Sequence, residues 1–111
     1  MAPRVVDANW NGKKIEVRVG EEIQIELGAI GGTGYSWYFD DLDSDFFDLI
    51  DEGTKVIAGE REGGAGNPVV MIWKLSAKKA GASVLRMSYY RVWEGRKKAV
   101  RHFEINVDIA P

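Results

Sequence analysis

The chain has 111 residues, of which 45% are hydrophobic and 29% are charged, and its formal net charge is −2. This is the length of one ordinary domain, so we expect residues 1–111 to form a single domain. The slightly acidic balance argues against a nucleic-acid binder, and no stretch is apolar enough to span a membrane. The sequence contains no cysteine, so disulfides give no information on its compartment. No signal peptide is visible, which leaves a cytoplasmic protein and a processed secreted or periplasmic protein both open.

The first part of the chain alternates apolar and polar residues with the period of two that indicates β-strands. The dipeptide Asn11-Gly12 favours a tight hairpin turn, and Gly20 and Glu21 form a second turn signal. We therefore predict two successive hairpins here. The inward rows of the predicted strands are Ile15, Val17 and Val19, followed by Ile23, Ile25 and Leu27.

A glycine-rich stretch, IGGTGYSW at 30–37, comes next and leads into the aromatic run YSWYF at 35–39. Aromatic residues favour strands, and this run is typical of a central, doubly buried strand with Trp37 in the core. Immunoglobulin-like sandwiches commonly bury a Trp at such a position. The glycines do not form a phosphate-binding loop, because no Lys follows them and no helix begins there.

An acidic segment, DDLDSDFFDLIDEG, follows at 40–53, and we interpret it as a connection with one short strand or turn. Its apolar residues are expected to anchor it to the core: Phe46, Phe47, Leu49 and Ile50. Asp41, Asp43, Asp45 and Glu52 occupy positions 1, 3, 5 and 12 of a calcium loop. However, Phe46 stands where such a loop needs Gly, so we predict no metal and no cofactor, with weak calcium binding kept as an alternative.

The second half of the chain continues the strand pattern. A second glycine loop at 61–68 ends in Pro68, which belongs at the beginning or edge of a strand. The last two inward rows are Leu85, Met87 and Tyr89, then Phe103, Ile105, Val107 and Ile109. Seven or eight short strands with essentially no helix predict an all-β fold, an immunoglobulin-like two-sheet antiparallel β-sandwich.

Catalysis needs a base, a nucleophile and a group that orients them. The chain has one histidine, His102, which is out of register with the inward row of the last strand. There is no cysteine and no Gly-x-Ser-x-Gly motif. We therefore predict that the protein is not an enzyme.

If successive strands run antiparallel, the loops at 30–35, 61–68 and 90–95 lie at one end of the sandwich. Two of them are rich in glycine, which lets another surface approach the backbone closely. The third carries Arg91 and Trp93, the residue types most enriched in binding hot spots. This end is therefore a candidate protein-binding surface.

These three loops, in this order, resemble those of the chagasin family, which inhibits papain-like cysteine peptidases. The family has the motifs Asn-Pro-Thr-Thr-Gly-Phe/Tyr, a glycine-rich loop and Arg-Pro-Trp; this chain has IGGTGY at 30–35, GGAG at 63–66 and RVW at 91–93. The resemblance extends from GEEIQIEL at 20–27 to RHFEINV at 101–107.

The resemblance implies a reversible inhibitor of papain-like cysteine peptidases, which occludes the cleft with three loops. We expect it to act as a monomer, and its charge and hydropathy predict that it binds neither nucleic acid nor a membrane. Trp93 would anchor the complex, and Arg91 would either share that contact or support its loop from behind. The peptidase-binding residues implied are Gly31, Gly32, Thr33, Gly34, Tyr35, Gly63, Gly64, Ala65, Gly66, Arg91, Val92 and Trp93.

The chain departs from the family pattern in the first and third loops. Ile30 and Gly31 replace Asn-Pro, Gly32 replaces the first Thr, and Val92 replaces the central Pro. Glycine loses more conformational freedom on binding than proline, so these changes favour a more flexible first loop. The alternative is a non-inhibitory immunoglobulin-like module that binds another protein, with weak calcium binding in the acidic segment.

Overall fold

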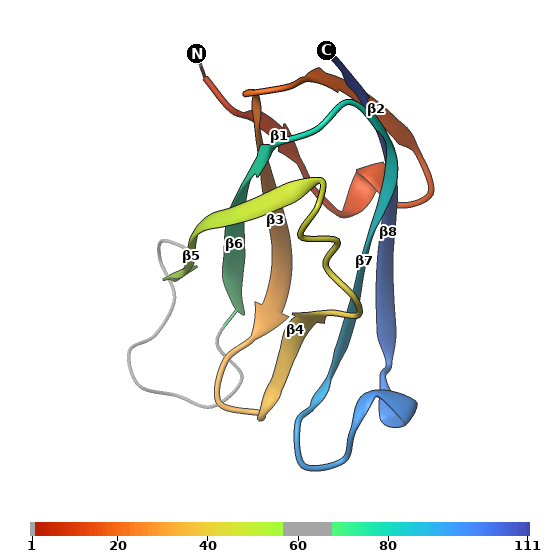
Figure 1. The fold of residues 1–111 in the computed structure, drawn as a ribbon. Helices are drawn as coiled ribbons and strands as arrows, with labels where there is room; N and C mark the ends of the chain where they lie inside the picture. The colour runs from red at the N-terminus through yellow and green to blue at the C-terminus, as the bar shows by residue number, and fades with distance from the viewer. Residues whose placement is uncertain (1, 57–67) are drawn as a thin grey trace.

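The structure is a computed structural model that describes residues 2–56 and 68–111. The described elements, in chain order, are β1 (Arg4–Val6), η1 (Ala8–Trp10), β2 (Lys14–Arg18), β3 (Glu22–Ile30), β4 (Tyr35–Phe39), β5 (Phe47–Val56), β6 (Pro68–Ala77), β7 (Gly81–Arg91), η2 (Arg96–Lys98) and β8 (Arg101–Ala110). They form two four-stranded sheets, ordered β1-β3-β6-β5 and β2-β8-β7-β4 (Figure 1). The described helices are single 3-10 turns, and none is long and apolar enough to cross a membrane.

The predicted all-β, two-sheet sandwich is confirmed, but its sheets are mixed and not purely antiparallel. Strand β1 pairs parallel with β3, and β2 pairs parallel with β8, while the other pairs are antiparallel. The chain crosses between the sheets after β2, so β2 lies beside the distant β8 and not beside its neighbour in sequence.

The prediction of two hairpins was wrong, because each turn joins strands that belong to different sheets. The Gly12 amide donates to the carbonyl of Glu104 (2.7 Å), and the Asn11 side chain accepts from the Glu104 amide (2.8 Å). These groups tie the turn to β8. At the second turn the Gly20 amide donates to the carbonyl of Ala77 (2.8 Å), which fixes the crossing. Both turn signals mark real turns that join different sheets.

The core lies between the sheets and is formed by the alternating rows that the sequence predicts. Trp37 is buried, and so is every residue of the predicted inward rows except Val19. Val19 is 42% exposed because it lies just past the end of β2. Pro68 begins β6, as predicted, in a position where its missing N–H does not interrupt the strand.

The aromatic strand β4 lies at the edge of its sheet and not in the centre. Among the described strands it pairs with β7 alone. Its aromatic rings are covered by those of β7: Trp37 contacts Tyr89 inside the sandwich (5.1 Å between centroids), and Tyr38 contacts Tyr90 on the outer face (4.8 Å). Aromatic cross-strand pairs therefore stabilise β4 at the edge of the sheet, where it has one described neighbouring strand.

The acidic segment forms more regular structure than predicted, because its second half begins the ten-residue edge strand β5, which continues to Val56. The register of β5 against β6 shifts between Leu49 and Asp51. Phe47 is buried and Phe46 packs against the core, as predicted, whereas Leu49 and Ile50 are 40% and 50% exposed. The last two residues lie where the register shifts, which disturbs the alternation on which the expectation depended.

Candidate functional site

Two of the three predicted loops lie together at one end of the sandwich, opposite both termini (Figure 1). We call this the loop end; it carries the connections 31–34, between β3 and β4, and 92–100, between β7 and β8. The β-strands next to the third predicted loop end at the same level, because Val56 pairs with Val69 and Pro68 pairs with Ile30. The predicted site residues of that loop, Gly63, Gly64, Ala65 and Gly66, lie outside the described residues.

The first loop is a compact turn that Thr33 closes with its own side chain. The Thr33 hydroxyl donates to the carbonyl of Ile30 (2.9 Å) and accepts from the amide of Tyr35 (3.3 Å). Gly32 and Gly34 have φ angles of 79° and 84°, in the left-handed region that glycine adopts without strain. The turn therefore needs glycine at these two positions, and the threonine offsets part of the flexibility that glycine brings.

The third loop presents an indole ring that rests on the first loop. Trp93 is 68% exposed and Val92 is 63% exposed. A β-carbon built on Gly34 would lie 3.0 Å from Cζ2 and 3.1 Å from Cζ3 of Trp93, and closer still to Cη2. One end of the ring is thus in contact with the Gly34 backbone while the rest faces solvent. The two loops form one continuous surface.

Arg91 lies behind this surface. Its guanidinium stacks over the ring of Tyr35 (4.6 Å to the centroid), its partner across the β4–β7 pair, and its Nε lies 3.9 Å from a carboxylate oxygen of Glu94. Tyr35 in turn stacks on Tyr89 (5.4 Å). Of the two roles considered for Arg91, this geometry favours support of the loop from behind.

Hydrogen bonds between the two sheets hold the loop end together. The hydroxyl of Tyr89 accepts from the Ile30 amide (3.0 Å), at the point where the first loop begins. The carbonyl of Gly28 accepts from Trp37 Nε1 (3.0 Å) and from Arg101 Nη1 (3.1 Å). The Arg101 guanidinium also lies over the Trp37 ring (5.1 Å). These bonds restrain the strands from which both loops emerge.

Tyr89 and Arg101 are not among the site residues that the sequence predicts. Tyr89 was placed correctly on an inward row, but its hydroxyl partner lies on the other sheet, and only the topology brings the two together. A tyrosine at the end of an otherwise aliphatic inward row is the one signal available, since a buried phenol hydroxyl usually finds a hydrogen-bond partner.

Asp40, Ser88 and His102 lie in contact, and they are the three residue types of a hydrolase triad. Ser88, which is 1% exposed, donates to Asp40 Oδ1 (2.6 Å), and its Oγ lies 3.3 Å from Nδ1 of His102. A hydroxyl has one proton, so the imidazole must donate in this second bond. His102 therefore cannot act as a base toward Ser88, whose oxygen is in any case buried. The prediction that His102 faces away from the core is confirmed.

The acidic segment folds as a turn. Asp43 Oδ1 accepts from the Asp45 amide (3.0 Å), and its carbonyl accepts from the amides of Phe46 and Phe47 (3.1 and 3.0 Å). Glu52, the last residue of the calcium pattern, pairs with Trp73 within the sheet. Across the described ranges, no group of three or more metal-ligating residues is close enough to hold an ion. The geometry therefore gives the calcium alternative no support.

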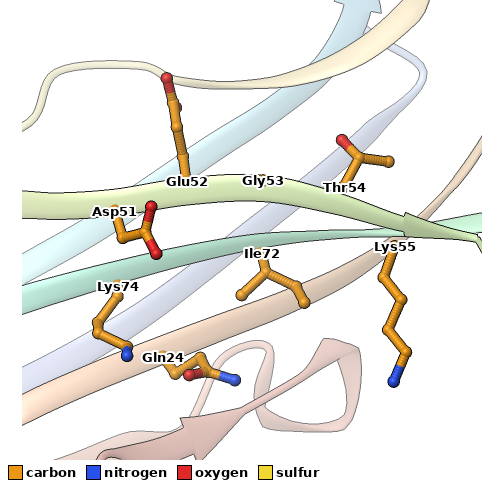
Figure 2. Close-up of a pocket in the computed structure, with 8 residues that line it drawn as sticks. All are labelled: Gln24, Asp51, Glu52, Gly53, Thr54, Lys55, Ile72 and Lys74. Atoms are coloured by element: carbon orange, nitrogen blue, oxygen red, sulfur yellow. The ribbon is translucent and has the colours of Figure 1, made fainter.

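A hollow on the outer face of the β3–β6–β5 sheet is the other candidate for a site. Figure 2 shows its lining residues: Gln24, Asp51, Glu52, Gly53, Thr54, Lys55, Ile72 and Lys74. Glu52 and Thr54 point to one side of β5 while Lys55 points to the other, as alternation along a strand requires (Figure 2). The hollow has charges of both signs and no nucleophile with a partnered base, so it offers no catalytic arrangement.

Exposed apolar side chains gather at the loop end. Of the eight large hydrophobic residues exposed in the described part of the chain, four belong to its strand ends and loops: Ile30, Val92, Trp93 and Val100. Exposed apolar side chains gathered at one end of a molecule are typical of a protein-interaction surface. The loop end is therefore a candidate protein-interaction surface of this β-sandwich.

The chain belongs to the chagasin family, since the model of that family, described as "Chagasin family peptidase inhibitor I42", matches residues 16–107. Members of this family are peptidase inhibitors and not enzymes, as the sequence predicts. A comparison with curated protein sequences found no significant match.

The solved structures that share the fold include the following three. The cysteine protease inhibitor EhICP2 from Entamoeba histolytica has a TM-score of 0.84 and 24% identity, over 96% of this chain and 94% of that one. The solution structure of amebosin gives a TM-score of 0.72 and 21% identity, over 98% and 99% of the two chains. PbICP-C, solved in complex with falcipain-2, gives 0.67 and 19%, over 96% and 98%.

Proposed function

We propose that this protein is a reversible inhibitor of papain-like cysteine peptidases that blocks the active-site cleft with its loop end. The observation that carries the proposal is the exposed Trp93 ring resting on Gly34, which makes two loops into one protruding apolar surface. Membership of the chagasin family supports it, and PbICP-C, a structural neighbour, has been solved with falcipain-2 bound.

The first loop is suited to block a cleft without being cleaved. Gly31, Gly32 and Gly34 carry no side chains, so their backbone can approach an active site closely. Thr33 holds the loop as a turn through its bonds to Ile30 and Tyr35 (2.9 and 3.3 Å), and not as an extended strand. The peptide bonds of the turn are therefore not presented as an extended substrate would present them.

Trp93 supplies the main contact in this proposal. Large aromatic side chains dominate binding energy when they fill a pocket on the partner, and this ring is 68% exposed before binding. Val92 adds apolar area beside it. We expect an interface of standard size, about 800 Å² per partner. Gly63, Gly64, Ala65 and Gly66 remain a predicted further contact.

The proposal is tested by titrating papain and a cathepsin-type peptidase, each at known active-site concentration, with this protein. We expect reversible inhibition at one inhibitor per enzyme, recovery of activity on dilution, and an intact inhibitor by mass spectrometry afterwards. Absence of inhibition at micromolar concentration across several such enzymes would reject the proposal and favour the non-inhibitory binding module.

A further inference from the structure

Positive charge is concentrated in one connection of this acidic protein. Residues 91–101 contain five basic and one acidic side chain, a net charge of +4, while the whole chain carries −2. The other 100 residues therefore carry −6. The basic segment is the β7–β8 connection with its adjoining strand ends, the same connection that presents Trp93 at the loop end.

The helix η2, at the centre of this segment, is held in place by Arg96. Arg96 Nη2 donates to the carbonyl of Asp40 (2.8 Å), and its Nε lies 3.7 Å from the Asp40 carboxylate. Asp40 is itself fixed by the hydrogen bond from the buried Ser88 (2.6 Å). The charge of Arg96 is thus used to attach η2 to the edge of the sheet.

Lys97 and Lys98 are not used in this way. Both are exposed, and within residues 2–56 and 68–111 neither makes an ion pair. The turn that carries them is closed by the bonds from the Lys98 amide to Gly95 and from the Ala99 amide to Arg96 (both 3.0 Å). In Figure 1, η2 lies beside the tip of the β7–β8 connection. Two exposed lysines are therefore carried by a hydrogen-bonded turn in the same connection as Trp93.

We infer that Lys97 and Lys98 form a basic rim of the peptidase-binding surface and select peptidases whose surface beside the cleft is acidic. The inference rests on the proposed function. Exposed charges at the rim of an interface change the rate of association more than the rate of dissociation, because they attract the partner before contact. The effect decreases with salt, since exposed charges more than about 10 Å apart are screened at 0.1 M ionic strength.

The test compares the double variant Lys97→Glu/Lys98→Glu with the double variant Lys13→Glu/Arg18→Glu. Both change the net charge by the same amount. Lys13 immediately precedes β2 and Arg18 is its last residue, and both lie away from the loop end. Within the described residues neither side chain makes an ion pair. Association and dissociation rate constants are measured from about 0.02 to 0.5 M salt, against two inhibited papain-like peptidases, one acidic and one basic.

For the acidic peptidase at low salt, we expect the Lys97/Lys98 variant to associate about tenfold more slowly, with dissociation changed less than about twofold. The difference should vanish at about 0.5 M salt, and the basic peptidase should show the opposite change. The control variant should stay within about twofold of wild type. Unchanged association of the Lys97/Lys98 variant, or an equal change in the control, would overturn the inference while inhibition itself stands. If the wild-type protein inhibits no peptidase, the proposed function fails and this inference fails with it.

Discussion

The indole ring of Trp93 lies against the α-carbon of Gly34, so that two loops distant in sequence support each other. Replacing Gly34 by Ala would put a methyl group into this ring and force a side chain onto a φ of 84°. We expect the inhibition constant of Gly34→Ala to rise at least about tenfold, because the Trp93 ring must move from the position it has in the free protein.

The matched control for this variant is Gly20→Ala. Gly20 has a φ of 93° and no atom within 4 Å of an added β-carbon, and it lies between β2 and β3, far from the loop end. Both variants should lose stability from backbone strain, on the order of 1 kcal/mol by urea unfolding. Only Gly34→Ala should lose inhibition. An equal rise in the inhibition constant of both variants would show that the contact between Gly34 and Trp93 does not affect inhibition.

Trp93 itself should contribute to binding and not to folding. It is 68% exposed, so Trp93→Ala should leave the melting temperature almost unchanged. The inhibition constant should rise at least about 30-fold, which corresponds to ~2 kcal/mol. Val92→Ala is the comparison variant, because Val92 is exposed to a similar degree (63%) but has a smaller side chain. Its inhibition constant should therefore rise less than that of Trp93→Ala. An unchanged constant for Trp93→Ala would remove this residue as the anchor.

Trp37 should show the reverse behaviour. It is 3% exposed, contacts Tyr89, and donates from Nε1 to the carbonyl of Gly28. Trp37→Ala should lose about 3–5 kcal/mol of unfolding free energy, because it leaves a cavity in the core. Trp37→Phe keeps part of the packing and should lose less. Unfolding in urea measures both, and an unaltered melting temperature in Trp37→Ala would contradict the placement of the side chain.

The rows of the core were predictable because they depend on local alternation alone. Ile23, Ile25 and Leu27 are buried, and their alternation predicts this without knowledge of the neighbouring strand. The neighbours of each strand were not predictable in this way: β4 is an edge strand, and β2 pairs with β8 from the far end of the chain. Such pairings depend on contacts between distant segments, which a period of two does not encode.

The same distinction applies to the candidate site. The sequence places Thr33, Gly34 and Trp93 in loops that lie at one end if successive strands alternate in direction. The described loops do meet there. The sequence does not show that Trp93 rests on Gly34, or that Arg91 lies over Tyr35. Both contacts depend on the pairing of β4 with β7, which places Tyr35 opposite Arg91, and no motif encodes that pairing.

Tyr89 provides the last prediction, because its hydroxyl links the sheet of β7 to the start of the first loop. In the native protein the Ile30 amide nitrogen lies 3.0 Å from the Tyr89 hydroxyl oxygen. Tyr89→Phe would leave this amide without its acceptor. We expect a loss of about 1–3 kcal/mol in unfolding free energy, the cost of leaving a backbone donor unpaired. Hydrogen exchange at the Ile30 amide should become faster, since the bond that protects it is removed.

Tyr90→Phe is the control for this variant. Tyr90 lies on the outer face against Tyr38, and within the described residues its hydroxyl makes no hydrogen bond. It should change neither stability nor the exchange of Ile30. If Tyr89 holds the first loop in its binding shape, Tyr89→Phe should also raise the inhibition constant, chiefly by slowing association, because the loop must order on binding. Faster exchange at Ile30 with an unchanged inhibition constant would show that the bond stabilises the sandwich without positioning the loop.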